Sequence, residues 1–316
     1  MINLTMIALG QLKGIGPSFL RNLDYNAIEQ QKCTVIEALP ELLASKGKRF
    51  DPEELTKAID TAEQVVYDCN RLGIQIHNFR EKTYPGIIYD SKDHPPLLFV
   101  LGNLQILSKK VACVIGTRKP DEVGIKIASR LGEYLAEHNV SICNGIAEGI
   151  DTASINSGRL ATQKNIGVLG CGLDIRRTLA SRKDTLEVVD RVLANEGLLI
   201  SEYTPQKQMD KFSLIKSCNL QAACAQKLVL IQSKLTGGSR FTVKAAFNYN
   251  REIYIIVPPV NFKSDTFEAN LLIKKNGLKE LFNFIEVNPT SKEPKRLGFI
   301  QSKEDYHSLV ENYDTN

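Results

Sequence analysis

The first 75 residues carry apolar side chains at helical spacing. Apolar positions recur three and four residues apart in the segments TMIALGQL, FLRNL, VIEALPELLA and LTKAIDTAEQVVYDCNRL. No apolar and polar residues alternate over a run long enough to predict a strand. The pattern therefore predicts a small helical domain over residues 1–75.

From about residue 105 the pattern changes to short apolar runs separated by amphipathic stretches. The runs predict strands at Val111–Ile115, Val140–Cys143, Ile166–Leu169, Leu198–Ser201, Leu228–Ile231 and Ile253–Val257. The stretches between them predict helices that include Asp121–His138, Gly149–Gln163, Asp184–Asn195 and Arg240–Asn250. Runs that are apolar throughout are typical of parallel strands buried on both faces. The predicted fold class is therefore α/β, with a Rossmann-like, doubly wound, mostly parallel sheet.

This change of pattern divides the chain into three parts. Residues 1–75 form the helical domain, residues 76–287 an extended Rossmann-like domain, and residues 288–316 a short polar tail that begins NPTSKEPKR. Within the helical domain, Gly14 and Gly16 predict a turn between two helices, and Pro17 suits the first turn of the second helix. This segment is similar to a SAM or helix–hairpin–helix module. Its backbone could hold a phosphate, or the glycines could serve only a tight turn between helices.

The composition excludes several classes of protein. The chain of 316 residues has 43% hydrophobic and 24% charged residues, which rules out a disordered, collagenous or purely coiled-coil chain. No apolar run is long enough to span a membrane, and the N-terminus lacks the basic region of a signal peptide. The seven cysteines contain no CxxC pair and mostly lie in apolar runs, so we expect free buried thiols and a cytoplasmic protein. The four histidines are scattered, so no metal site is expected.

Four loops that follow predicted strands contain glycine. They are GTRKP (116–120), NGIAEGID (144–151), GCGLD (170–174) and LTGGSRFT (235–242). In a doubly wound sheet these loops meet at one edge, where backbone N–H groups and helix N-termini favour an anion. The sequence therefore predicts a phosphate site at this edge.

The motifs of common nucleotide enzymes and hydrolases are missing from the sequence. There is no GxGxxG after the first strand of the predicted sheet, and no GxxxxGK[ST], GxSxG or HExxH motif. Asp151 and Asp174 stand at the starts of helices, where an aspartate more often caps backbone N–H groups than acts as a catalytic acid. The expected phosphate site is therefore not the usual dinucleotide site or that of a Walker-type NTPase.

The glycine loops resemble motifs of the DNA-processing protein A family (DprA, also called Smf). GTRKP, NGIAEGID and LGCGLD are similar to the family's G[ST]R, SGxAxGID and LGxGLD motifs. GLLISEY, GGSRFTVKAA and REIYIIVPP are also similar, as are the upstream segment TYPGIIYDSKDHPPLLFVLGNL and the downstream segment NLLIKKNG. The resemblance covers about residues 5–285.

The resemblance implies a non-catalytic protein that binds single-stranded DNA without a cofactor. It further implies a homodimer formed through the Rossmann-like domain and a RecA-type recombinase as partner. The implied DNA-binding residues are Gly116, Thr117, Arg118, Lys119, Gly145, Gly149, Lys216, Asn219, Gly238, Ser239, Arg240, Thr242 and Lys244. An arginine beside glycine-rich backbone suits a phosphate.

The chain also departs from the family pattern. Glu148 stands where a basic residue is usual, and a carboxylate there repels a phosphate. The basic FPxRNRxIxxLS helix has become FSLIKSCNLQAACAQ, where Lys216 and Asn219 are the plausible substitutes. The tail is too short for the winged helix of many members. These differences indicate a divergent member of the family.

Two other functions are compatible with these departures. One is a regulatory protein of a toxin–antitoxin or phage-defence pair, which neutralises a cognate toxin. The other is a protein that binds or cleaves nucleotides, although the GGSRFTVKA segment lacks the glutamate of the PGGxGTxxE loop. A partner gene for a toxin would favour the first, and release of a base from nucleotides the second.

The distribution of charge favours the DNA-binding hypothesis. The formal net charge is only +4, with 40 basic and 36 acidic residues. Residues 205–251, however, hold eight basic residues and one acidic residue, a net of +7, and residues 106–130 hold six and two, a net of +4. Because both segments flank the glycine loops, we predict a basic edge of the sheet, as a phosphate backbone requires.

Overall fold

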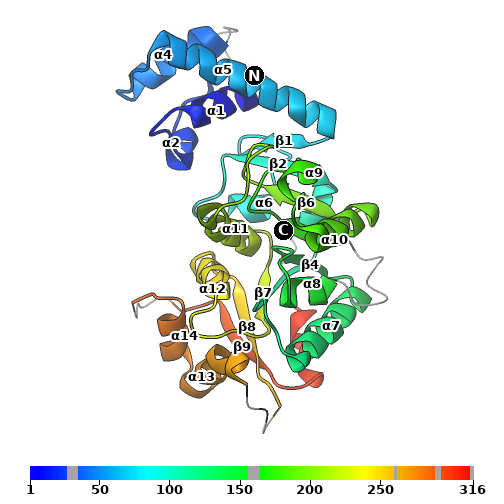
Figure 1. Ribbon diagram of the computed structural model, residues 1–316. Coiled ribbons are helices and arrows are strands. Elements are labelled where there is room, and N and C mark those ends of the chain that lie inside the picture. The colour runs from blue at the N-terminus through cyan, green and yellow to red at the C-terminus, as the bar shows by residue number, and fades with distance from the viewer. Residues whose placement is uncertain (27–34, 156–163, 260–261, 263, 289–292, 314–316) are drawn as a thin grey trace.

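The protein consists of a helical N-terminal part at one end of a long mixed sheet (Figure 1). The computed structural model describes residues 1–26, 35–155, 164–259, 262, 264–288 and 293–313. The order of elements agrees with the predicted α/β class, with helices first and alternating strands and helices afterwards.

The N-terminal part is helical, as predicted from its apolar spacing. It contains α1 (Ile2–Gln11), α2 (Pro17–Arg21), α4 (Val35–Ser45) and α5 (Pro52–Leu72). Asp51 and Glu54 form a capping box at the start of α5, and Gly73 ends this helix with a φ of 69°. Gly14 has a φ of 80° in the turn between α1 and α2, so the predicted turn between two helices is present.

One sheet of nine strands forms the centre of the molecule. The strands are β1 (Gln75–Asn78), β2 (Leu97–Gly102), β3 (Val111–Ile115), β4 (Ser141–Asn144), β5 (Ile166–Val168), β6 (Leu198–Ser201), β7 (Lys227–Leu230), β8 (Glu252–Ile256) and β9 (Arg296–Ile300). Their order in the sheet is β1-β2-β6-β5-β4-β3-β7-β8-β9. The strands from β3 to β9 are parallel, whereas β2 pairs antiparallel with β1 and β6. All six predicted strands are present, with ends that differ by at most one residue.

The sheet changes direction between β3 and β7. The chain builds β3, β4, β5 and β6 outward on one side of β3, and then returns to place β7 and β8 on its other side. Such a switch point leaves a crevice at the carboxyl ends of the two central strands, because their loops lead away in opposite directions.

Helices cover both faces of the sheet (Figure 1). They are α6 (Gly86–Tyr89), α7 (Glu122–Glu137), α8 (Ile150–Ile155), α9 (Ile175–Thr178), α10 (Lys183–Ala194), α11 (Lys211–Ala223), α12 (Ser239–Asn248), α13 (Glu268–Asn276) and α14 (Leu278–Phe284). Side chains of α7, α8 and α10 join the core on one face, and those of α11 to α14 join the core on the other. The helix predicted over Gly149–Gln163 is present as far as Ile155, and its remaining residues lie outside the described ones.

The C-terminal segment differs from the expected polar tail. Residues Arg296–Ile300 form β9, which pairs with β8, and a 3-10 helix follows over Glu304–Leu309. Tyr306 and Leu309 are buried, and the buried amine of Lys227 donates to the carbonyl of Ser308. The sequence did not predict this strand, because its short run RLGFI directly follows the polar segment NPTSKEPK, and its residues are mostly only partly buried.

Three expectations from composition can be compared with the described residues. Cys69, Cys113, Cys143, Cys171 and Cys224 are free and buried, and Cys218 is free and partly exposed. No group of His, Cys, Asp and Glu side chains suited to a metal occurs in the ranges given above. Within those same ranges, no helix has the length and apolar character needed to cross a bilayer.

Candidate functional site

The loops after β3 and β7 meet at the switch point of the sheet. The backbone N–H of Thr117 donates to the carbonyl of Gln232 at 2.8 Å, which joins the two loops directly. The Gln232 side chain donates to Asp121 at 2.8 Å and to Thr266 at 2.7 Å. Asp121 also caps α7 by accepting from the N–H of Gly124 at 2.9 Å. This network fixes both walls of the crevice.

The loop after β4 packs against the loop after β3. Gly149 has a φ of 89°, and a Cβ there would lie 2.5 Å from the carbonyl oxygen of Thr117. The N–H of Ile150 donates to that same carbonyl at 3.2 Å. Only glycine allows this close approach, so the sequence motif at this position reflects contact between two loops. The structure therefore brings Gly116, Thr117 and Gly149 together, as expected.

The carboxylate of Asp151 occupies the inside of the β4 loop. Its Oδ2 atom accepts from the N–H of Gly145 at 3.2 Å and from the N–H of Ala147 at 3.3 Å. Burial raises the pKa of Asp151 to about 7, against the lowering effects of these hydrogen bonds and of Arg118. The expected capping role is present, but Asp151 caps the loop, and the N–H of Gly145 faces this carboxylate rather than an external anion. Asp174 is the N-cap residue of α9 without a side-chain capping bond.

Ile146 of the β4 loop has an unusual backbone conformation. Ile146 is buried and has a φ of 50°, which is rare for a β-branched residue. Its N–H donates to the side chain of Asn144 at 3.0 Å, and Asn144 in turn donates to the carbonyl of Asp151 at 3.0 Å. Backbone strain of this kind persists where surrounding contacts hold it, and it concentrates at functional sites.

The predicted residues nearest the crevice differ in exposure. Arg118 and Lys119 are exposed, and the charge of Arg118 acts on the buried carboxylate of Asp151. Glu148 is also exposed on the neighbouring loop. Gly238 is open to solvent, whereas Ser239 hydrogen-bonds to Ser233 at 2.7 Å and Thr242 is buried against Cys218.

Arg240 and Lys244 have partners on the other side of α12. Arg240 forms an ion pair of 2.8 Å with Glu286, and Lys244 donates to the backbone carbonyl of the same residue at 3.2 Å. These two cations therefore connect α12 to the end of α14. They are less available to a phosphate than Arg118 and Lys119.

Lys216 and Asn219 belong to a different pocket. Lys216 of α11 pairs with the buried carboxylate of Glu202 at 2.9 Å. Asn219 lines a pocket of about 130 Å³ together with Lys216, Glu202 and Arg21 of the helical part. The structure thus separates this pair from the glycine loops and places it beside the N-terminal helices.

The basic residues of the charge-rich segments lie at both ends of the sheet. Lys109 and Lys110 precede β3, Arg251 precedes β8 and Lys227 is the first residue of β7, so all four lie at the edge opposite the glycine loops. Lys227 is buried, and Arg251 donates to the carbonyls of Ile87 and Ala223. The prediction that the basic residues gather at one edge of the sheet is therefore wrong. The two charge-rich segments contain whole strands, so their basic residues lie at both ends of those strands.

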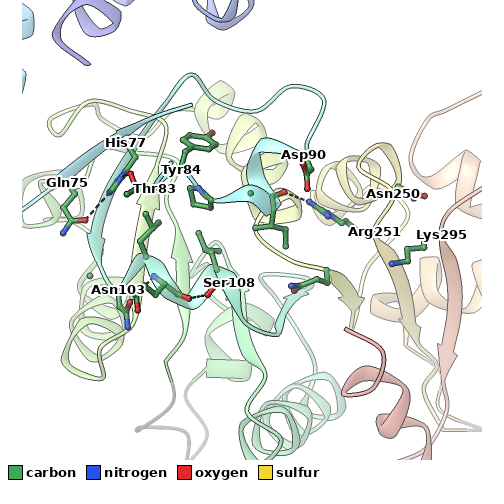
Figure 2. A pocket seen from close by; sticks show the side chains of 18 residues that line it. Gln75, His77, Thr83, Tyr84, Asp90, Asn103, Ser108, Asn250, Arg251 and Lys295 are labelled. Carbon is green, nitrogen blue, oxygen red and sulfur yellow. Dashed lines mark hydrogen bonds between the residues drawn. The ribbon is translucent and has the colours of Figure 1, made fainter. Parts of the chain in front are cut away.

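A cavity of about 970 Å³ lies at that opposite edge. Figure 2 shows His77, Tyr84, Asp90, Arg251 and Lys295 among the residues around it. It is lined mostly by residues of β1, of the segment around α6 and of the connection from β2 to β3, together with residues that precede β7, β8 and β9, and by none of the predicted site residues.

One exposed aromatic residue was missed by the sequence analysis. Phe212, at the start of α11, exposes 75% of its surface. The next two residues, Ser213 and Leu214, pack against Gly170 in the loop after β5. A large apolar side chain with this exposure suits a ligand with a flat apolar face. From the sequence, Phe212 was expected to lie in a helix, and the apolar pattern alone predicts that such a side chain faces the core.

Comparison with known proteins identifies relatives of this chain. The family described as DNA recombination-mediator protein A matches residues 75–286. The DNA processing protein DprA of Streptococcus pneumoniae is 30% identical over 173 residues, which cover 55% of this chain and 59% of that protein. Protein Smf of Synechocystis is 23% identical over 259 residues, or 78% of this chain and 63% of the relative. The chain thus spans less than two thirds of the length of these relatives.

Two solved structures resemble the fold. The X-ray structure of DNA processing protein A from Streptococcus pneumoniae has a TM-score of 0.72 at 19% identity, and the match covers 98% of this chain and 99% of that one. A structure of DNA processing protein A from Helicobacter pylori has a TM-score of 0.54 at 24% identity, covering 67% of this chain and 94% of that one. The Helicobacter structure is described as giving insight into a single-stranded DNA binding mode. At these identities the likeness establishes the fold.

Proposed function

This chain belongs to the DNA recombination-mediator protein A family, and on that premise we propose that it binds single-stranded DNA at the glycine loops of its sheet. The observation that supports the proposal is the switch point between β3 and β7, where the exposed cations Arg118 and Lys119 lie beside glycine-rich backbone. The binding mode named for the Helicobacter relative supports the same ligand.

The backbone of the strand supplies most of the binding energy in this proposal. Arg118 and Lys119 contact phosphates on one wall of the crevice, and the open backbone at Gly238 allows close approach on the other. Contacts of this kind release counterions and read no sequence. The carboxylate of Glu148 lies on the same rim and weakens the site, which makes the affinity lower than a fully basic rim would give.

Phe212 gives the bases a stacking surface. Its 75% exposure leaves a ring face free, and the helix that carries it contacts the loop after β5. Stacking on an aromatic ring tolerates every base, so this contact adds affinity with little sequence preference. The function that follows is to hold a single strand and pass it to, or sense it for, partner proteins.

The test compares two exposed cations at opposite ends of the same strand. We expect Arg118→Ala to weaken binding of oligothymidine about 10-fold and to reduce the salt dependence by about one phosphate contact. Lys109→Ala removes the same charge from the far end of β3, so the affinity of this control should stay within about twofold of the wild type. Fluorescence anisotropy over a series of salt concentrations measures both effects.

The outcome also separates this function from its main alternative. Binding that responds neither to salt nor to Arg118→Ala contradicts the proposal. That result favours the regulatory protein of a toxin pair, for which the pairing of Lys216, Arg240 and Lys244 within the chain is the supporting observation. A recombinase partner, a homodimer through the Rossmann-like domain and the lack of catalytic activity stay predictions.

A further inference from the structure

Asp151 is a buried carboxylate at the floor of the glycine loops. It is 6% exposed, and its Oδ2 atom holds the N–H groups of Gly145 and Ala147 at 3.2 and 3.3 Å. The N–H of Ile150, the residue before this aspartate, donates to the carbonyl of Thr117 in the β3 loop at 3.2 Å. The carboxylate therefore lies where the two loops that carry the proposed phosphate site meet.

The surroundings of this carboxylate offer little compensating charge. Arg118 is the cation that acts on it, and no lysine or arginine forms an ion pair with it in the described ranges. The other titratable neighbours are thiols: Cys113 of β3, Cys143 of β4 and Cys218 of α11. Burial raises the pKa of all three thiols, so they stay neutral near pH 7.

An anion at the loops changes the balance at Asp151. A phosphate beside Arg118 neutralises part of the positive charge that stabilises the Asp151 carboxylate. It also adds a negative charge nearby. Both effects disfavour the charged form of the aspartate. The protonated carboxyl still accepts from the backbone N–H groups, so the loops keep their arrangement.

We propose that binding of a DNA phosphate at the glycine loops is coupled to the uptake of a proton by Asp151. The inference rests on the proposed function, because it concerns the same site. A proton from solvent adds to the carboxylate, the charge of the side chain changes from −1 to 0, and no bond of the DNA is broken. The strand therefore binds more tightly as the pH falls.

The size of the effect follows from linkage. The pKa of Asp151 is about 7 in the free protein, so carboxyl and carboxylate are both populated at neutral pH. If the phosphate raises that pKa by about one unit, the affinity increases about fivefold from pH 8 to pH 6. Backbone phosphates do not titrate in this range. With a dye that has no titrating group, the probe itself adds no pH dependence to the measured affinity.

The experiment measures affinity and proton exchange together. Anisotropy with a Cy3-labelled oligothymidine gives the affinity of the full chain at constant ionic strength between pH 6 and pH 8. Calorimetry in PIPES and in imidazole at pH 7 gives the number of protons taken up, because the two buffers differ in ionisation enthalpy. We expect net uptake by the wild type, and neither uptake nor pH dependence for Asp151→Asn.

Glu148→Gln is the matched control. It removes an exposed carboxylate from the same loop, so it should raise the affinity at every pH and keep the pH dependence. Wild-type calorimetry alone decides the case if Asp151→Asn does not fold. Binding without proton uptake overturns this inference and leaves the proposed function intact, whereas failure to bind DNA at any pH overturns the proposed function itself.

Discussion

Single residues of the glycine loops have roles that their motifs only partly reveal. Gly149 is glycine because its backbone touches Thr117, and Asp151 is aspartate because it satisfies loop N–H groups at the same place. Both therefore shape the β4 loop, which packs against the β3 loop that carries Arg118. Arg118 itself is exposed.

Gly149→Ala is expected to destabilise the protein by about 2 kcal/mol, because a φ of 89° strains alanine and its Cβ meets backbone atoms of Thr117 and Arg118. Urea unfolding measures the loss. Gly238→Ala is the control, since nothing lies within 4 Å of its added Cβ and its φ is −63°. A loss for Gly238→Ala as large as that for Gly149→Ala would contradict the explanation.

Asp151 also makes the stability depend on pH. Its pKa is raised to about 7 in the folded state, so its favourable contribution is present below the unfolded-state value near 4 and is lost as the pH rises through 7. We expect the wild type to lose about 2 kcal/mol relative to Asp151→Asn between about pH 5.5 and pH 8. Urea unfolding at each pH gives the difference, and parallel curves for the two proteins would refute it.

At the scale of elements, the loops are held by the helices that follow them. Asp121 caps α7 and accepts from Gln232, Ser264 and Thr266, which ties the β3–α7 connection to the β7 loop. The helix α11 contributes differently from the family pattern. Lys216 pairs with Glu202, which follows β6, and both line a pocket together with Arg21 of the helical part.

Asp121→Ala should destabilise the fold by about 1 to 2 kcal/mol, because α7 loses its N-cap and Gln232 loses an acceptor. Thermal unfolding followed by circular dichroism measures the change. Asp121→Asn retains a capping oxygen, so it should recover most of the lost stability. An alanine variant as stable as the asparagine variant would contradict the capping role.

At the scale of the whole molecule, the sheet continues beyond the six predicted strands. β1 and β2 extend it toward the helical part, and β9 covers the edge of β8. The last described residues are part of this core, since Leu309 is fully buried. The basic residues distribute over both ends of the sheet, so the net charge of a sequence segment overstates the charge of one edge.

Leu309→Ala is expected to cost about 2 to 4 kcal/mol, because it leaves a cavity beneath the C-terminal segment. Leu271→Ala, at a position that is 40% exposed, should cost less than about 1 kcal/mol. Urea unfolding compares the two variants. Equal losses would show that the C-terminal segment is a solvated tail.

The sequence alone determined the fold class, the six central strands and the glycine loops that we propose as the site. It did so because burial on both faces demands continuous apolar runs, and because glycine is needed where backbones touch. Only the tertiary structure decided which basic side chains remain available to a phosphate. In the sequence, Lys216, Arg240 and Lys244 are basic residues like Arg118. In the folded chain, however, each of the three is paired with a residue distant in sequence. The structure likewise showed that the N–H groups of the β4 loop face Asp151, since a hydrogen-bond partner depends on the path of the folded backbone.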